Sequence, residues 1–138
     1  MAMVGQKQKS VKGQNEMGFL DSLLRQGAKK IISEVADAEV EEKLRAVFSH
    51  EFPQYEIRED VSPTTIGGTG NFMNYTFGVY ENGAPKLFIM VVGNNDCAKR
   101  TYRWSKEQAE RAGVTLINFV AQFENRMDYI IDRLHQYL

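Results

Sequence analysis

KLFIMVVGNNDCAKR, residues 86–100, decides the fold of this chain. Its first part is apolar at six consecutive positions before Gly93, and a strand of that kind needs cover on both faces. The polar residues after the glycine offer a helix N-cap at Asn95 or Asp96. The stretch therefore predicts the central strand of a sheet, followed by a helix.

The residues after this stretch predict a helix, a strand and a second helix. The first helix runs from about 98 to 112 and ends at Gly113, where a left-handed backbone suits glycine. It leads to a fourth strand, VTLINFV at 114–120, and its length allows a right-handed parallel crossover. Apolar residues spaced three and four apart predict the last helix, whose first turn starts with Glu124. The side chains expected to face inward are Tyr102, Ser105, Ala109 and Ala112, and then Met127, Ile130, Ile131 and Leu134.

Two more strands are predicted ahead of the central one. Aromatic and β-branched residues at 72–80 indicate a strand, and the Asn82-Gly83 pair suits a tight hairpin turn into the central strand. An earlier short strand lies at 54–60. The glycine-rich segment between them, at 62–71, is interpreted as a loop.

Two helices are predicted before the first strand. Helical spacing of apolar residues indicates one over 19–35, and a second begins after an N-cap at Asp37 and ends before Pro53. We expect residues 1–16, which are polar and show no periodicity, to form a disordered arm, and 17–138 to form a single globular domain. The apolar face of the second helix is Val40, Leu44, Val47 and Phe48.

Together these elements predict an α/β fold of the three-layer α+β kind. A four-stranded mixed sheet has helices on both faces, and the order is helix, helix, strand, strand, strand, helix, strand, helix. We find no internal repeat and no linker that would divide the domain.

Composition and charge restrict the functions open to the chain. Its 138 residues suffice for one core, and 43% hydrophobic with 25% charged residues are typical of a globular protein. The 17 Lys and Arg against 18 Asp and Glu give a net charge of -1, so binding to nucleic acid must use a local patch. One cysteine forms no intrachain disulfide, and no apolar run approaches the roughly 20 residues of a transmembrane helix. We expect a cytoplasmic protein.

The predicted order of elements resembles the core of the PD-(D/E)XK nuclease-like superfamily. The stretches that carry the resemblance are NYTFGVYENGAPKLFIMVVGNND at 74–96 and YRWSKEQAERAGVTLINFV at 102–120, and it covers roughly 40–138. It implies a restriction-endonuclease-like core. Active members hold a divalent metal between an Asp that begins the second strand and a Glu of the third, and a Lys two residues later assists the attacking water.

This sequence departs from the nuclease motif at all three positions. Asn74 stands where the resemblance places the Asp, Met90 where it places the Glu, and Val92 where it places the Lys. Because Mg²⁺ prefers hard oxygen ligands, a thioether and an isopropyl group neither hold it nor move a proton. We therefore predict no catalytic residue, no metal site and no cofactor. A metal-dependent nuclease with relocated acids remains the alternative, and the candidate acids are Glu51, Glu81 and Asp96.

The most informative cluster of polar and aromatic residues is predicted on the crossover helix. Arg100, Trp104, Gln108 and Arg111 share one face, because they are spaced by four, four and three residues. A tryptophan between guanidinium groups can stack on a nucleic-acid base, and Trp and Arg are also favoured anchors of protein interfaces. A third interpretation is that Trp104 folds onto a neighbouring element. The predicted contact residues are Lys99, Arg100, Arg103, Trp104, Gln108 and Arg111.

The leading functional hypothesis is a non-enzymatic binding or interaction protein on a degenerate nuclease-like fold. Its contact surface is the face around Trp104, and its partner is a protein; a nucleic-acid-binding module is the alternative. The amphipathic helix at 19–35 follows a basic arm. We expect that helix to pack on the domain or to form a homodimer with its copy, and we do not expect it to lie on a membrane.

Overall fold

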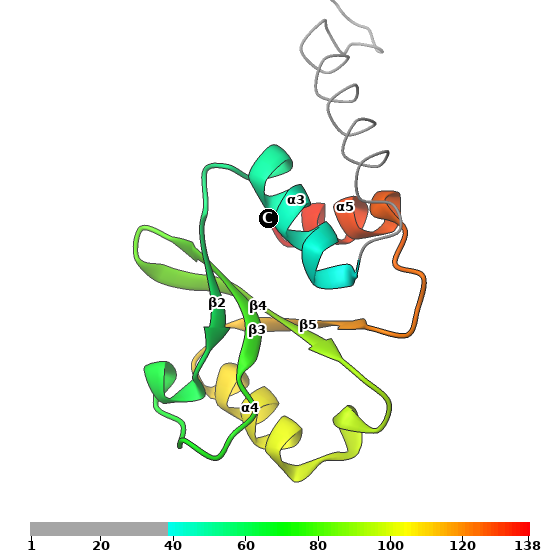
Figure 1. The fold of residues 1–138 in the computed structure, drawn as a ribbon. Coiled ribbons are helices and arrows are strands. Elements are labelled where there is room, and N and C mark those ends of the chain that lie inside the picture. The colour runs from blue at the N-terminus through cyan, green and yellow to red at the C-terminus, as the bar shows by residue number, and fades with distance from the viewer. Residues whose placement is uncertain (1–38) are drawn as a thin grey trace, which may run out of the picture.

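The computed structural model describes residues 39–138, and four of their segments form one mixed sheet (Figure 1). The strand order is β2-β3-β4-β5, in which β4 and β5 are parallel and the other neighbours antiparallel. The predicted four-stranded mixed sheet is therefore confirmed. In chain order the elements are α3 (Val40–Glu51), β2 (Glu56–Val61), a 3₁₀ helix (Pro63–Ile66), β3 (Tyr75–Glu81), β4 (Ala84–Val92), a 3₁₀ helix (Asp96–Ala98), α4 (Arg100–Arg111), β5 (Thr115–Val120) and α5 (Met127–His135).

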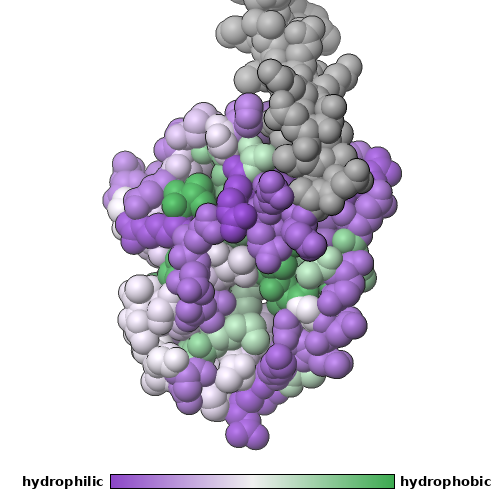
Figure 2. Space-filling view, in the orientation of Figure 1, coloured by the Kyte–Doolittle hydropathy of each residue, from purple (hydrophilic) through white to green (hydrophobic). Residues whose placement is uncertain are grey.

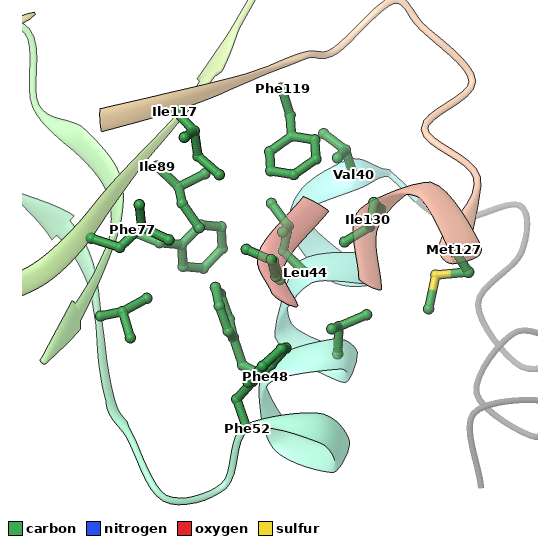
Figure 3. Close-up of a cluster of buried hydrophobic side chains, with 14 residues drawn as sticks. Val40, Leu44, Phe48, Phe52, Phe77, Ile89, Ile117, Phe119, Met127 and Ile130 are labelled. Atoms are coloured by element: carbon green, nitrogen blue, oxygen red, sulfur yellow. The ribbon is translucent and has the colours of Figure 1, made fainter. Parts of the chain in front are cut away.

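The helices lie on both faces of the sheet. Figure 1 shows α3 and α5 on one face and α4 on the other. In the first layer, side chains of α3 and α5 point at strand residues such as Phe77, Ile89 and Phe119 (Figure 3). This core also holds a contact between the rings of Phe48 and Phe77, whose centroids lie 5.5 Å apart.

A second core lies between the sheet and α4. Strand β4 contributes to both cores, because successive side chains of a strand point to opposite faces. Leu87 and Ile89 belong to the α3 and α5 side, whereas Phe88 and Met90 belong to the α4 side, and all four are buried. The prediction that this strand is covered on both faces is confirmed.

The turn and the crossover follow the predicted local chemistry. Asn82 and Gly83 have φ angles of 54° and 80°, the left-handed values that a tight hairpin turn requires. Gly113, which follows the C-cap of α4, has a φ of 74° and turns the chain toward β5. The parallel pair β4 and β5 runs in register from Leu87 opposite Thr115 to Val92 opposite Val120.

Several predicted boundaries differ from the structure. The N-cap of α3 is Glu39, whereas Asp37, the helix over 19–35 and the arm at 1–16 lie outside the described residues. The helix predicted from about 98 begins at Arg100, because the residues before it form a 3₁₀ helix. Ala112 was expected inside and is exposed, since it is the C-cap of α4.

The surface in the orientation of Figure 1 is mostly hydrophilic. Figure 2 shows hydrophobic residues only in small areas between polar ones on this face. Within residues 39–138, no helix combines the length and the apolar character that crossing a bilayer requires.

Candidate binding surface on α4

Trp104 contacts an aromatic ring from the loop that precedes β3. The ring centroids of Phe72 and Trp104 lie 5.5 Å apart, with the planes tilted by 37°, and both residues are half-buried. The guanidinium carbon of Arg100 lies 6.0 Å from the centroid of the Trp104 ring. The two rings border a hollow of about 400 Å³, lined by Thr69, Asn71, Phe72, Trp104, Glu107 and Arg111. We call Phe72, Arg100, Trp104, Glu107 and Arg111 the Trp104 surface.

Hydrogen bonds hold the loop at 67–74 against α4. The Met73 amide donates to the Thr101 carbonyl at 3.2 Å, and the Ser105 hydroxyl donates to the Met73 carbonyl. The Tyr75 hydroxyl donates to the Ser105 carbonyl at 2.6 Å. Phe72 is therefore carried by a segment whose backbone is fixed on the helix that carries Trp104.

Gln108 does not lie where the sequence analysis placed it. It was predicted on the exposed face with Trp104, but it is buried, and its amide nitrogen donates to the Ile66 carbonyl at 2.6 Å. Its amide oxygen accepts a hydrogen bond from Arg111 at 3.3 Å. The reason is that the loop after β2 covers this flank of α4, which helical spacing alone does not reveal.

The predicted cations differ in their environments. Lys99 forms an ion pair with Asp96 at 2.8 Å, and together with the Gly93 amide this pair holds the pKa of Asp96 below its usual value. A guanidinium nitrogen of Arg111 lies 3.9 Å from a carboxylate oxygen of Glu107. Lys99, Arg100 and Arg103 are exposed, and none of the three lines the hollow.

Of the six predicted contact residues, the structure brings two together at the hollow. Trp104 and Arg111 line it together with Phe72 from the loop, and Arg100 lies beside the Trp104 ring without lining the hollow. Sequence reasoning missed Phe72 because it assigned that residue to a strand, whereas β3 begins at Tyr75. An aromatic residue beside a glycine-rich loop was the only signal present.

The three positions at which the resemblance would place the nuclease motif lie in two different environments. Met90 and Val92 are each 1% exposed and belong to the core between the sheet and α4. Asn74 is exposed, and its side-chain amide donates to Asp60 at 3.0 Å. The exit of β4 on this face is therefore apolar.

The three acids considered as relocated ligands are not brought together. A carboxylate oxygen of Glu51 lies 3.5 Å from the His135 ring nitrogen Nε2. A carboxylate oxygen of Glu81 lies 3.8 Å from the Lys86 ammonium, near the hairpin turn. Asp96 forms its ion pair with Lys99 beyond the end of β4. In the part of the chain that the structure describes, no three His, Cys, Asp or Glu residues are grouped so that they could hold a metal ion.

Comparisons with known proteins do not assign this site. No family model matches the chain, and neither a curated protein nor a solved structure matches it.

Proposed function

We propose that the protein is a non-enzymatic binding protein that holds a protein partner against the Trp104 surface. The observation that carries this proposal is the contact of Trp104 with Phe72 beside a hollow bordered by Arg111. Half-buried aromatic rings with a guanidinium group beside them supply a large contact area at low entropic cost, and such residues dominate the energetics of protein interfaces. The two arginines, Arg100 and Arg111, favour a partner segment that carries acidic side chains.

The packing around the hollow supports a preformed site. Because Gln108, Ser105 and Thr101 bind the backbone of the loop, Phe72 does not have to be ordered when a partner arrives. A surface that is already ordered loses less conformational entropy on binding. The interpretation that Trp104 folds onto a neighbouring element applies in part, because its ring contacts Phe72, but both residues keep part of their surface exposed and line the hollow.

Nucleic-acid binding is a second candidate, and the position of Arg100 favours it. A guanidinium group close to a tryptophan ring forms the kind of platform on which bases of a single strand stack. The net charge of -1 opposes it, because affinity from counterion release needs several phosphates to be neutralised.

We further propose that the fold is a degenerate relative of the PD-(D/E)XK nucleases. The antiparallel β2, β3 and β4 followed by a parallel crossover to β5 support this kinship. Apolar Met90 and Val92 support the loss of chemistry, and a nuclease with relocated acids is the weaker alternative, because Glu51, Glu81 and Asp96 lie apart.

The proposal is tested by partner capture with a matched control. The full-length protein is immobilised and exposed to a soluble extract of its source cells, as wild type, as Trp104→Ala and as Tyr137→Ala. Tyr137 is an exposed aromatic residue at the end of α5, on the other face of the sheet. We expect a specific protein to be retained by the wild type and by Tyr137→Ala and lost by Trp104→Ala. After purification, that protein should bind Trp104→Ala with about 2 kcal/mol less free energy by calorimetry.

The nucleic-acid candidate is tested in parallel by fluorescence. Trp104 is the only tryptophan in the sequence, so its emission reports directly on a ligand that stacks there. A thymidine oligonucleotide of about 20 nucleotides is titrated over a salt series. Quenching that weakens steeply as the salt concentration rises would show that the Trp104 surface binds nucleic acid rather than a protein partner. A captured protein that binds Trp104→Ala as tightly as wild type would contradict the proposed surface.

A further inference from the structure

The sheet has two outer edges, and they differ in chemistry. Strands β2 and β5 each pair with a single neighbour among residues 39–138, so each presents backbone groups on its other side. An edge of this kind is a template for pairing with another strand unless charges, bulges or a covering element prevent it.

The β2 edge carries the features that prevent pairing. Four of its six residues are charged, and two ion pairs, Arg58 with Glu56 and Arg45 with Glu59, cover its surface. Asp60 has a φ of 54°, which interrupts the extended backbone. A second strand placed along β2 would have to desolvate these charges.

The β5 edge carries none of these features. Its sequence, TLINFV, has no charged residue and no proline over Thr115–Val120. A hollow of about 360 Å³ beside its first half leaves room at the edge, and the residues around it are Lys106, Glu110, Gly113, Val114, Thr115 and Leu116. Tyr129 packs on Phe119 of this strand and is 49% exposed.

The hydrogen-bond pattern shows which backbone groups point outward. The Ala121 amide donates to the Val92 carbonyl, so odd-numbered residues of β5 bond to β4 and even-numbered ones face away. The Val120 carbonyl accepts a hydrogen bond from the Asn125 side chain at 2.8 Å. In the described part of the chain, the outward amides and carbonyls of Leu116 and Asn118 have no partner.

We propose that the protein forms a two-fold dimer in which β5 pairs antiparallel with β5 of a second copy, centred on Ile117. In this register Leu116 of each copy lies opposite Asn118 of the other, and four backbone hydrogen bonds satisfy the outward groups of both. Thr115 lies opposite Phe119, a β-branched residue against an aromatic one, which is a favourable cross-strand pair. The same patch meets itself, as a two-fold interface requires.

This dimer goes beyond the proposed function and does not depend on it. Trp104 and the hollow that it borders face the loop before β3, whereas the β5 edge lies at the end of the sheet away from β2 and β3. Both surfaces are therefore accessible at the same time. The dimer is also distinct from one formed through the helix predicted over 19–35.

Sedimentation velocity of the full chain over a concentration series tests the proposal. The wild type should change from 15.8 kDa to twice that mass as its concentration rises. Thr115 is exposed, so its substitution leaves the monomer core intact. In the dimer, Thr115→Lys sets a cation beside Phe119 and Arg133 of the other copy, because Arg133 lies over the Phe119 ring at 5.7 Å. We expect a dissociation constant raised at least about tenfold, whereas the matched control Thr115→Val keeps the wild-type value.

A backbone variant gives an independent measurement. Leu116→Pro removes an outward amide without removing a hydrogen bond to β4, so it should also abolish the dimer. If that variant does not fold, the comparison of Thr115→Lys with Thr115→Val decides alone. A wild type that stays monomeric up to about 100 μM overturns the proposal. So does a dimer that Thr115→Lys leaves unchanged, which would indicate contact through another surface.

Discussion

Tyr75 shows how burial in the core between the sheet and α4 changes the pKa of a single ionisable side chain. The residue has no exposed surface; its ring stacks on Phe88, with centroids 4.1 Å apart and planes within 2°. Its hydroxyl donates to the Ser105 carbonyl at 2.6 Å. Burial raises the pKa of Tyr75 to about 12, because the phenolate would lose its hydration. The folded protein keeps this proton over a range in which the unfolded chain releases it.

We predict that Tyr75 makes the free energy of unfolding fall between about pH 10 and pH 12. Its folded pKa is raised, so the stability it contributes is complete below the unfolded pKa and is lost as the pH rises through the folded value. Tyr75→Phe should remove this part of the slope, and at pH 8 it should cost about 1–2 kcal/mol, because the Ser105 carbonyl loses its donor.

Urea unfolding of wild type and Tyr75→Phe at pH 8 and pH 11 measures both effects. Other tyrosines and lysines titrate in both proteins, so only the difference between the two curves reports on Tyr75. Equal pH slopes would mean that the Tyr75 hydroxyl is solvated in the folded protein.

At the scale of elements, α4 packs against the sheet and also binds the loop that precedes β3. Its buried residues are Tyr102, Ser105, Gln108 and Ala109, and two of them are polar because they bind loop backbone. Periodicity predicted the helix, its stop at Gly113 and three of these inward residues. It placed Gln108 outside, because spacing shows which residues share a face but not which loop covers that face.

We predict that Gln108→Leu loosens the loop that carries Phe72. The substitution keeps the side-chain volume but leaves the Ile66 carbonyl without its donor, which should cost about 1–2 kcal/mol of stability. Hydrogen exchange should become faster at the amides of Gly67 and Gly68, which bond to Thr64 and Pro63 within the same loop.

The matched control is Glu110→Gln, an exposed substitution on the same helix that should change stability by less than about 0.5 kcal/mol. Unchanged exchange at both glycines in Gln108→Leu would show that the bonds from Ser105 and Thr101 suffice to hold the loop.

At the scale of the whole molecule, the sheet was more predictable than the binding surface. The consecutive apolar residues of β4 and the Asn82-Gly83 turn are local signals that specify a strand between two layers and a hairpin. The Trp104 surface instead joins residues about 30 positions apart, from Phe72 to Trp104, and no local pattern specifies that contact. Of the six predicted contact residues, Trp104 and Arg111 line the hollow, because they lie on one face of α4.

The two-sided cover of β4 gives a final prediction, which concerns the proposed kinship with nucleases. Met90→Glu introduces the carboxylate that the resemblance requires, but at a position that is 1% exposed among apolar side chains. We expect a loss of about 3–6 kcal/mol at neutral pH, because a buried carboxylate loses hydration without gaining a partner. The introduced carboxyl should have a raised pKa when folded, so the loss should be smaller at pH 5 than at pH 8.

Met90→Leu, the volume-conserving control, should cost less than about 1.5 kcal/mol. Thermal unfolding at both pH values, with and without Mg²⁺, measures these differences. A Met90→Glu protein as stable as Met90→Leu, or one stabilised by Mg²⁺, would show that this face of β4 still accommodates the charge and the metal of an active nuclease.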